Sequence, residues 1–469
     1  MYTPTKNNKT LGVFGLVMIN VIAIDSLRNL PSNAATGLHI IFYYILAGII
    51  FLLPCVLITA ELATNRPKTG GAYIWVRDAF GPKYGFMTIW LQWIYNIIWY
   101  PTILSFIAVN VAYLFDPSLV THKGYMVPMI IAMFTLSTLA NSFGMKLSSL
   151  ISTLSAIIGT IIPMIIIIIL GILWIHDGKP LAIAPTVANL IPTHFGDSNA
   201  AFLVVVFFSL VGIEMSAVHA GDVRNPKRDY PRALTYSSLI VLITMTLASA
   251  AIAIVVPKTD LNIVSGLDQA FALFLNNFHL KWMMPIVIVF MVLGGFGGMS
   301  AWVIGPTKGL MVAAQDNCAP KFFAKANANG APTHMLWAQW AVVAVLCLFF
   351  LFFKSFNMWY WILSDLTAQL ALLFYILMFA AAIRLRYTTE RKADTFRIPG
   401  GKPGIWITGL VGIGACIFAM IIGLIPPTDM HITHVAWYET FLIGGCIVFS
   451  VIPLIIYAAT KAKQRNACT

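Results

Sequence analysis

Twelve runs of about 20 predominantly apolar residues dominate this chain, and each is long enough for an α-helix to cross the hydrocarbon core of a bilayer. Of the 469 residues, 59% are hydrophobic and 10% are charged, whereas about 25% of residues in a soluble domain are charged. The chain is therefore predicted to be an all-α membrane protein with twelve transmembrane helices, at 11–36, 39–63, 84–114, 125–142, 147–175, 199–220, 232–256, 282–314, 335–354, 357–384, 404–424 and 437–460.

Lys and Arg residues are unevenly divided between the two sets of loops that alternate along the chain. One set carries 22 of the 29, and the other carries only Lys123, Lys179, Lys258, Lys281 and Lys354. Cytoplasmic loops are enriched in Lys and Arg, so the N-terminal segment 1–10 and the short tail 461–469 are predicted to be cytoplasmic. The net charge of +12 then reflects membrane topology and does not indicate a nucleic-acid partner.

The sixth apolar run is interrupted by Gly212 and Glu214. A carboxylate at the centre of a bilayer costs about 2.5 to 3.5 kcal/mol on insertion scales, so Glu214 is expected to face a cavity or a polar ligand rather than lipid. Glycine weakens a helix where a ligand would need free backbone groups. We therefore interpret this stretch as one half of a split binding site.

The first run repeats the interruption. Its middle, 24–33, holds Asp25, Arg28 and Pro31 among other polar residues, and such a stretch cannot be a lipid-facing helix. Two interrupted spans five apart are the pattern of an inverted-repeat secondary transporter whose site lies at the midplane. We expect a first repeat at 11–175, a second at 199–384 and two extra helices within 404–460.

The chemistry of such a site indicates the substrate. Half-helix N-termini present unpaired N–H groups and a partial positive charge to a carboxylate, while unwound carbonyls and a nearby carboxylate hold an ammonium group. A molecule with both groups fits, namely an amino acid or a related amine. A short amphipathic helix over 266–275 is expected along the outer face.

Four motifs make the chain similar to the amino acid–polyamine–organocation transporter superfamily over nearly its whole length. They are Glu61-Leu62-Ala63 with 67–73 and 79–81, Gly212-Ile213-Glu214 with 225–228 and 231–233, 315–320 with Asn327, Gly330 and Pro332, and Phe396-Arg397-Ile398-Pro399-Gly400-Gly401. Residues 378–387 before the last motif resemble the glutamate/GABA antiporter branch most. The resemblance implies the 5+5 inverted-repeat, LeuT-like fold and a bacterial inner membrane.

The resemblance also implies functional residues. Ile24-Asp25-Ser26 occupies the place of the family's Gly-Ser-Gly break, Phe208 that of an aromatic lid, and Trp302 that of a tryptophan packing on the substrate. The expected substrate-binding residues are Ala23, Ile24, Asp25, Ser26, Tyr95, Asn96, Phe208, Gly212, Glu214 and Trp302; the expected gating or coupling residues are Arg28, Phe208, Glu214, Lys308 and Asp365. Some proton-coupled relatives carry a lysine where Gly159 stands here, which favours exchange over proton coupling.

Each charged residue also has a purely structural interpretation. Asp25 and Arg28 could form an ion pair that braces the break, and Glu214 could cap backbone groups of the broken helix. Lys308 could snorkel toward the cytoplasm or pair with a carboxylate. Asp365 is a further buried carboxylate, whose partner the sequence does not identify.

The predicted function is amino acid exchange by alternating access. A proton- or sodium-coupled symporter is the main alternative within transporters. A channel is a weaker alternative because no continuous polar stripe runs through several helices. The sequence contains no catalytic constellation and no metal-type spacing, so we expect no enzymatic activity, metal or cofactor. A homodimer is compatible with the sequence.

Overall fold

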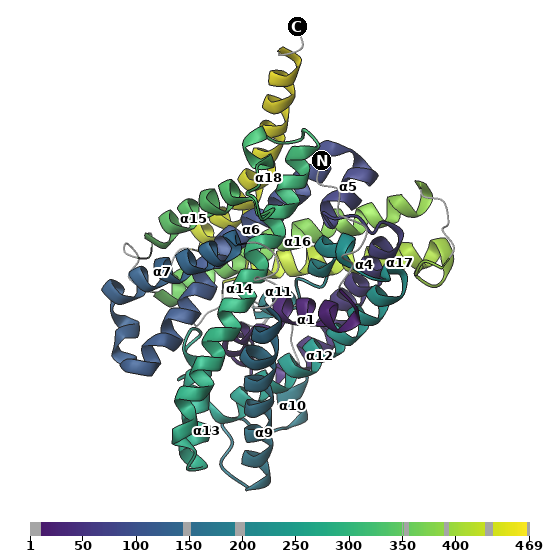
Figure 1. The fold of residues 1–469 in the computed structure, drawn as a ribbon. Helices are drawn as coiled ribbons and strands as arrows, with labels where there is room; N and C mark the ends of the chain where they lie inside the picture. The colour runs from purple at the N-terminus through teal and green to yellow at the C-terminus, as the bar shows by residue number, and fades with distance from the viewer. Residues whose placement is uncertain are drawn as a thin grey trace.

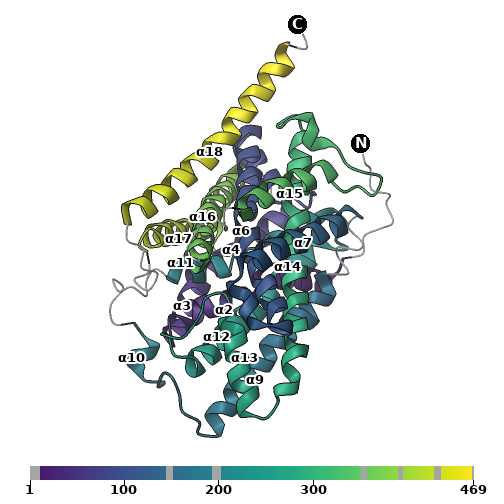
Figure 2. The same ribbon diagram turned by 90° about the vertical axis from the view of Figure 1, so that its left-hand side faces the viewer.

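The computed structural model describes residues 11–143, 152–192, 202–348, 350, 356–388, 394–426 and 435–466. Within these ranges the chain is helical and contains no β-strand; a single isolated bridge joins Leu11 and Val223 in parallel. Helices pack side by side, with α13 and the C-terminal end of α18 at opposite ends of the molecule (Figures 1 and 2). The predicted all-α class is confirmed.

The first part of the chain comprises the elements up to residue 192. They are α1 (Val13–Ile24), η1 (Leu27–Asn29), α2 (Leu30–Ala34), α3 (His39–Ala47), η2 (Gly48–Leu52), α4 (Leu53–Asn65), α5 (Ala72–Phe80), α6 (Pro82–Phe115), η3 (Pro117–Thr121), α7 (Lys123–Ser142), η4 (Ser155–Ile161), α9 (Ile162–His176) and α10 (Val187–Leu190).

The second part begins with another interrupted segment. Its elements are α11 (Phe202–Ser209), η5 (Met215–Asp222), α12 (Pro226–Val255), α13 (Gly266–Asn277), η6 (Lys281–Met283), α14 (Met284–Gln315), η7 (Lys321–Ala324), α15 (Thr333–Leu348), α16 (Phe356–Thr388), α17 (Gly401–Gly423) and α18 (Val435–Asn466). Helix α13 coincides with the amphipathic helix expected over 266–275.

Ten segments of the described chain are long and apolar enough to cross a membrane, and they correspond to ten of the twelve predicted spans. The predicted sixth span consists of α11, a non-helical turn and η5, so neither half reaches the length of a crossing. The predicted ninth span, 335–354, is described as the 16-residue helix α15, and most of its remaining residues lie outside the described ranges. The chain is an integral, multi-pass membrane protein.

Helices η4 and α14 approach so closely that only glycine fits between them. A Cβ atom on Gly159 would overlap the backbone of Gly294, and the reverse also holds. Small residues let helix backbones meet closely inside a membrane. The glycine cluster at 294–298 therefore serves helix packing, and Gly159 lies in this contact.

Polar contacts join three of the four sequence motifs, namely those that begin at Glu61, at residue 315 and at Phe396. Glu61 accepts a hydrogen bond from the backbone N–H of Ile398 at 2.8 Å and forms an ion pair with Arg386 at 3.3 Å. Tyr73 donates to Asp316 at 2.7 Å, and Arg77 pairs with the same carboxylate. Charge-assisted bonds of this kind join α4 to α16 and α5 to the C-terminal end of α14.

Candidate substrate site

The first interruption follows directly from its residues. Helix α1 ends at Ile24, and Asp25 and Ser26 leave helical geometry, with ψ values of 79° and 115°. Short polar side chains compete for backbone hydrogen bonds, and Pro31 at the start of α2 has no N–H to continue a helix. The interruption is almost completely buried, which confirms that this segment is not a continuous lipid-facing helix.

The second interruption turns on Gly212. Helix α11 ends at Ser209, and Gly212 has φ of +122°, a conformation that L side chains rarely adopt. Its N–H donates to the hydroxyl of Tyr375 on α16 at 2.8 Å. A Cβ atom here would lie 2.9 Å from the ring of Trp302. Both conformation and space therefore require glycine.

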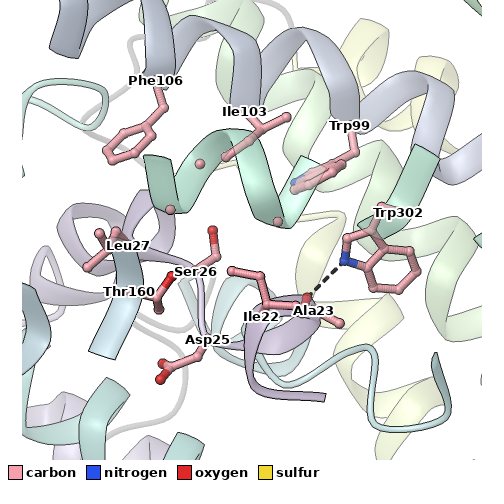
Figure 3. Close-up of a pocket in the computed structure, with 13 residues that line it drawn as sticks. Ile22, Ala23, Asp25, Ser26, Leu27, Trp99, Ile103, Phe106, Thr160 and Trp302 are labelled. Carbon is pink, nitrogen blue, oxygen red and sulfur yellow. Dashed lines mark hydrogen bonds between the residues drawn. The ribbon is translucent and has the colours of Figure 1, made fainter. Parts of the chain in front are cut away.

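Trp302 on α14 connects the two interruptions. Its indole N–H donates to the carbonyl oxygen of Ala23 at 2.9 Å (Figure 3). Its ring packs against Gly212. Tyr100 on α6 donates to the backbone oxygen of Trp302 at 3.0 Å. On another side, Tyr44 on α3 links Asn33 of α2 to Ser209 of α11 through bonds of 2.6 and 2.9 Å.

A small cavity lies beside the first interruption. Four of the predicted substrate-binding residues line it, namely Ala23, Asp25, Ser26 and Trp302, and Trp99 lies across from the break (Figure 3). The full lining also includes Ile22, Leu27, Ile103, Phe106, Thr160, Gly294, Gly295 and Gly298. Ile24, Tyr95, Asn96, Phe208, Gly212 and Glu214 do not belong to this lining.

Asp25 is directed toward α12. One of its carboxylate oxygens accepts a hydrogen bond from Thr244 at 2.9 Å, and the other has no hydrogen-bond partner among the described residues. The ion pairs of the described chain include none between Asp25 and Arg28. The structural alternative of a bracing ion pair is thus not what this structure contains.

Arg28 is directed away from Asp25, toward α6 and α16. Its Nη1 donates to Thr102, Tyr360 and Ser364 at 3.0, 3.1 and 3.3 Å, and its Nη2 donates to Asn29 at 2.7 Å. The guanidinium carbon lies 5.8 Å from the ring centroid of Phe208. Arg28 thus connects the first interruption to the predicted aromatic lid.

Glu214 is buried and faces α6 and α16. It accepts hydrogen bonds from the hydroxyl of Tyr375 and from the amide of Gln92, the latter at 3.2 Å. It makes no side-chain capping bond to the helix η5 that follows, so the capping alternative is not observed. Tyr375 bridges the interruption, because it receives the Gly212 N–H and donates to Glu214.

Two further predicted site residues lie on α6 near Glu214. The ring of Tyr95 packs edge-on against Trp302, with centroids 6.0 Å apart, and it contacts Phe374 in the same way. Asn96 donates to the backbone oxygen of Gln92 at 2.7 Å. Both side chains are buried, so they belong to the packed wall between the interruptions and α16.

Lys308 and Asp365 lie outside this group. Lys308 on α14 interacts electrostatically with Asp222 and His219 of η5, at the end of that element away from the interruption. Asp365 accepts a hydrogen bond from Tyr438, so it connects α16 to α18. Neither residue lines the cavity. The partner of Asp365, Tyr438, was not identified from the sequence.

The structure also contains polar partners that the sequence did not single out. Tyr375, Gln92 and Thr244 all hold a predicted site carboxylate. Gln92 is an amide within a strongly apolar span, and that was a usable signal. Tyr375 and Thr244 lie on uninterrupted helices and carried no comparable signal.

Comparison with known proteins gives a consistent result. The family profile described as "Amino acid permease" matches residues 9–451. An uncharacterized transporter of Legionella pneumophila is 49% identical, covering 99% of both chains. A glutamate/gamma-aminobutyrate antiporter of Lactococcus lactis is 26% identical over 96% of this chain and 91% of its own. A probable agmatine/putrescine antiporter of Lactococcus lactis is 24% identical over 84% and 83%.

Proposed function

Because this chain belongs to the amino acid permease family, as its motifs indicated, we propose that it is a secondary-active transporter that exchanges one amino acid or related amine for another. Two relatives that align with most of the chain are named as antiporters. Transport of a small amino acid or amine across a membrane follows from the family, and the antiporter relatives support exchange as its mode.

The observation that carries the proposal is the meeting of the two interruptions at Trp302. Ala23 offers a carbonyl oxygen that no longer bonds within a regular helix, and Asp25 offers a carboxylate oxygen without a partner. Such groups suit a substrate ammonium. A substrate entering here would displace the Trp302 ring from Gly212 and open a shared space between the interruptions.

Alternating access requires one group of helices to move together. The backbone N–H of Leu11 donates to Asp222 at 3.1 Å, and that of Arg224 donates to Leu11 at 2.9 Å. These bonds join the beginning of α1 to the end of η5, and α1 also packs against α12. We infer that the first, second, sixth and seventh spans rock as a bundle against a scaffold formed by the third to fifth and eighth to tenth spans.

Obligatory exchange needs an empty carrier that reorients poorly. Asp25, Arg28 and Glu214 are buried without an ion-pair partner among the described residues. Moving uncompensated charges through an apolar interior is costly. A charged substrate would compensate them, so the loaded carrier would reorient faster than the empty one.

The test is counterflow with the purified full chain in proteoliposomes. A thermal-shift screen of amino acids, GABA and simple polyamines first identifies ligands. Vesicles preloaded with an unlabelled ligand should then take up the labelled ligand much faster than empty vesicles. Equal uptake into empty and preloaded vesicles would contradict obligatory exchange.

An ion-coupled symporter is the second candidate, because Asp25 lines the cavity with one unpartnered oxygen. A bound proton or sodium ion could neutralise this carboxylate. Uptake into empty vesicles that depends on an imposed proton or sodium gradient would favour the symporter. We further propose a bacterial inner-membrane location with both chain ends cytoplasmic, which the distribution of Lys and Arg supports.

A further inference from the structure

Arg28 differs from the other buried arginine of the described chain in what compensates its charge. Arg386 has the carboxylate of Glu61 3.3 Å away. Arg28 is 2% exposed, and every hydrogen-bond acceptor around it is neutral: the hydroxyls of Thr102, Tyr360 and Ser364 and the amide oxygen of Asn29. Burying a charge without an opposite charge is costly, so the binding of an anion next to Arg28 would be energetically favourable.

Donor capacity remains on the same guanidinium. The Nε–H of Arg28 is buried and has no hydrogen-bond partner among the described residues. Arginine binds a carboxylate best in a bidentate way, through two parallel N–H donors. Nε and one Nη form such a pair of donors, and the neutral hydroxyls on Nη1 are weaker acceptors than a carboxylate.

Arg28 lies close to a residue that lines the cavity and to the predicted aromatic lid. Its guanidinium lies 5.9 Å from the ring centroid of Trp99 and 5.8 Å from that of Phe208. Trp99 lines the cavity, as do Ser26 and Leu27, which directly precede Arg28. The ring of Trp99 therefore lies beside both the cavity and the guanidinium.

The carboxylates of the protein itself do not fill this role. Asp25 bonds to Thr244 on α12, and Glu214 bonds to Tyr375 and Gln92. Gln92 and Thr102, the α6 partners of Glu214 and Arg28, are ten residues apart, which corresponds to about 15 Å along a helix. Within the described chain, the anion that would compensate Arg28 must come from outside.

We propose that Arg28 binds the side-chain carboxylate of an acidic amino acid and so sets a preference for the acid over its neutral amide. This inference rests on the proposed transport function and names the substrate class of that site. The alternative is that Arg28 only braces the interruption against α6 and α16, in which case it would not distinguish the two ligands.

Glutamate and glutamine, and aspartate and asparagine, are matched pairs that differ in charge but hardly in shape. Counterflow with each pair should favour the acid in the wild type. In Arg28→Gln the ratio of acid to amide uptake should fall about tenfold or more, since a hydrogen-bonded charge pair is lost, while uptake of the amide persists. Arg28→Lys should retain part of the preference, because it keeps the positive charge but loses the two parallel N–H donors of the guanidinium.

Tyr360→Phe is the matched control. It removes one neutral hydrogen bond to Arg28 but keeps the aromatic ring beneath the guanidinium, so the ratio of acid to amide should stay close to that of the wild type. A bracing role predicts instead that Tyr360→Phe and Arg28→Gln lower both members of each pair by equal factors. That result would overturn the proposal, as would a wild type without preference for either acid.

A second measurement does not depend on transport. Glutarate, a dicarboxylate without an amino group, should raise the apparent melting temperature of the detergent-purified wild type and should not raise that of Arg28→Gln. Failure of glutarate to stabilise the wild type, or equal stabilisation of both proteins, overturns the role of Arg28. Absence of any amino acid counterflow in a wild type that glutarate stabilises would instead contradict the proposed function.

Discussion

The indole N–H of Trp302 donates to the carbonyl oxygen of Ala23 at 2.9 Å, across 279 positions of the sequence. That carbonyl lies where α1 gives up its helical hydrogen bonds, so the tryptophan supplies a donor that the backbone cannot. The same ring packs against Gly212 in the other interruption. A single side chain of α14 thus holds both interrupted segments.

Trp302→Phe should lower exchange strongly while lowering stability only modestly. The variant keeps an aromatic ring but leaves the Ala23 oxygen without its donor, and a hydrogen bond inside a membrane protein contributes about 0.6 to 2 kcal/mol. Counterflow rate and apparent melting temperature measure the two effects. A variant with wild-type counterflow would remove Trp302 from the mechanism.

Trp340→Phe is a suitable control for this substitution. The Trp340 indole donates to Thr135 at 2.9 Å between α15 and α7, away from both interruptions. It therefore loses a bond of the same kind, and its melting temperature should fall by a similar amount. Its counterflow should stay near that of the wild type.

Gly212→Ala should destabilise the protein by about 1 to 3 kcal/mol, the usual cost of a residue held in a sparsely populated backbone conformation. The new methyl group would also press on Trp302. We expect a lower melting temperature and little exchange. Gly414→Ala on α17 has open space around its Cβ position, and alanine favours a helix over glycine, so that control should match or exceed wild-type stability.

The interruptions were predictable because polar residues, glycine and proline stand in otherwise apolar runs. Asp25, Arg28 and Pro31 cannot be accommodated in a lipid-facing helix. Gly212 has a positive φ, which requires glycine at this position. These constraints are local, so the sequence alone carries them. The amphipathic helix α13 was predictable for the same reason, because its pattern is contained within twelve residues.

The partners of the buried charges were not predictable, because tertiary packing alone brings them together. Tyr375 lies 161 positions from Glu214, and Thr244 lies 219 positions from Asp25. Both are ordinary residues of continuous helices. The spacing of Asp25 and Arg28 suggested an ion pair, but the loss of helical geometry between them turns the two side chains toward different helices.

Glu214→Gln should depress exchange, or shift its pH optimum, without loss of folding. Glutamine keeps the size and can still hydrogen-bond Tyr375 and Gln92, while the titratable charge disappears. Counterflow at several pH values, with size-exclusion chromatography as the folding check, measures this. A variant with the wild-type rate and pH profile would exclude Glu214 from the mechanism.

Tyr375→Phe tests the hydrogen bonds that Tyr375 forms with Gly212 and Glu214. The Gly212 N–H would lose its acceptor and Glu214 would lose a donor. Glu214→Gln and Tyr375→Phe disturb the same hydrogen-bonded group. The variant that carries both substitutions should therefore lose less exchange activity, expressed as free energy, than the sum of the two single losses. Simple additivity of the losses in exchange would indicate that Tyr375 and Glu214 act independently.

The stability of the protein should fall as the pH rises, because of Asp268 on α13. This helix is not among the candidate membrane-spanning segments, yet Asp268 is fully buried, and neither of its carboxylate oxygens forms a hydrogen bond with another residue of the described chain. Burial raises the pKa of Asp268 to about 8, compared with about 3.9 in an unfolded chain. The folded state therefore holds the proton more tightly.

A raised carboxyl pKa contributes stability that is fully present below about pH 3.9 and is lost as the pH approaches 8, by at most about 1.4 kcal/mol per pH unit. The apparent melting temperature of the wild type should decline from about pH 5 to about pH 8. Asp268→Asn cannot ionise, so its melting temperature should depend less on pH and should exceed that of the wild type near pH 8.

Asp116→Asn separates this effect from the general pH dependence of the chain. Asp116 is exposed, and hydrogen bonds from the Ser118 side chain and backbone lower its pKa. Its contribution is present above the unfolded pKa and is lost only in stronger acid, so the slope between about pH 5 and 8 should match the wild type. If Asp268→Asn showed the same decline of melting temperature with pH as the wild type, the carboxyl group of Asp268 would not be its cause. The decline would then have to arise from other titratable groups.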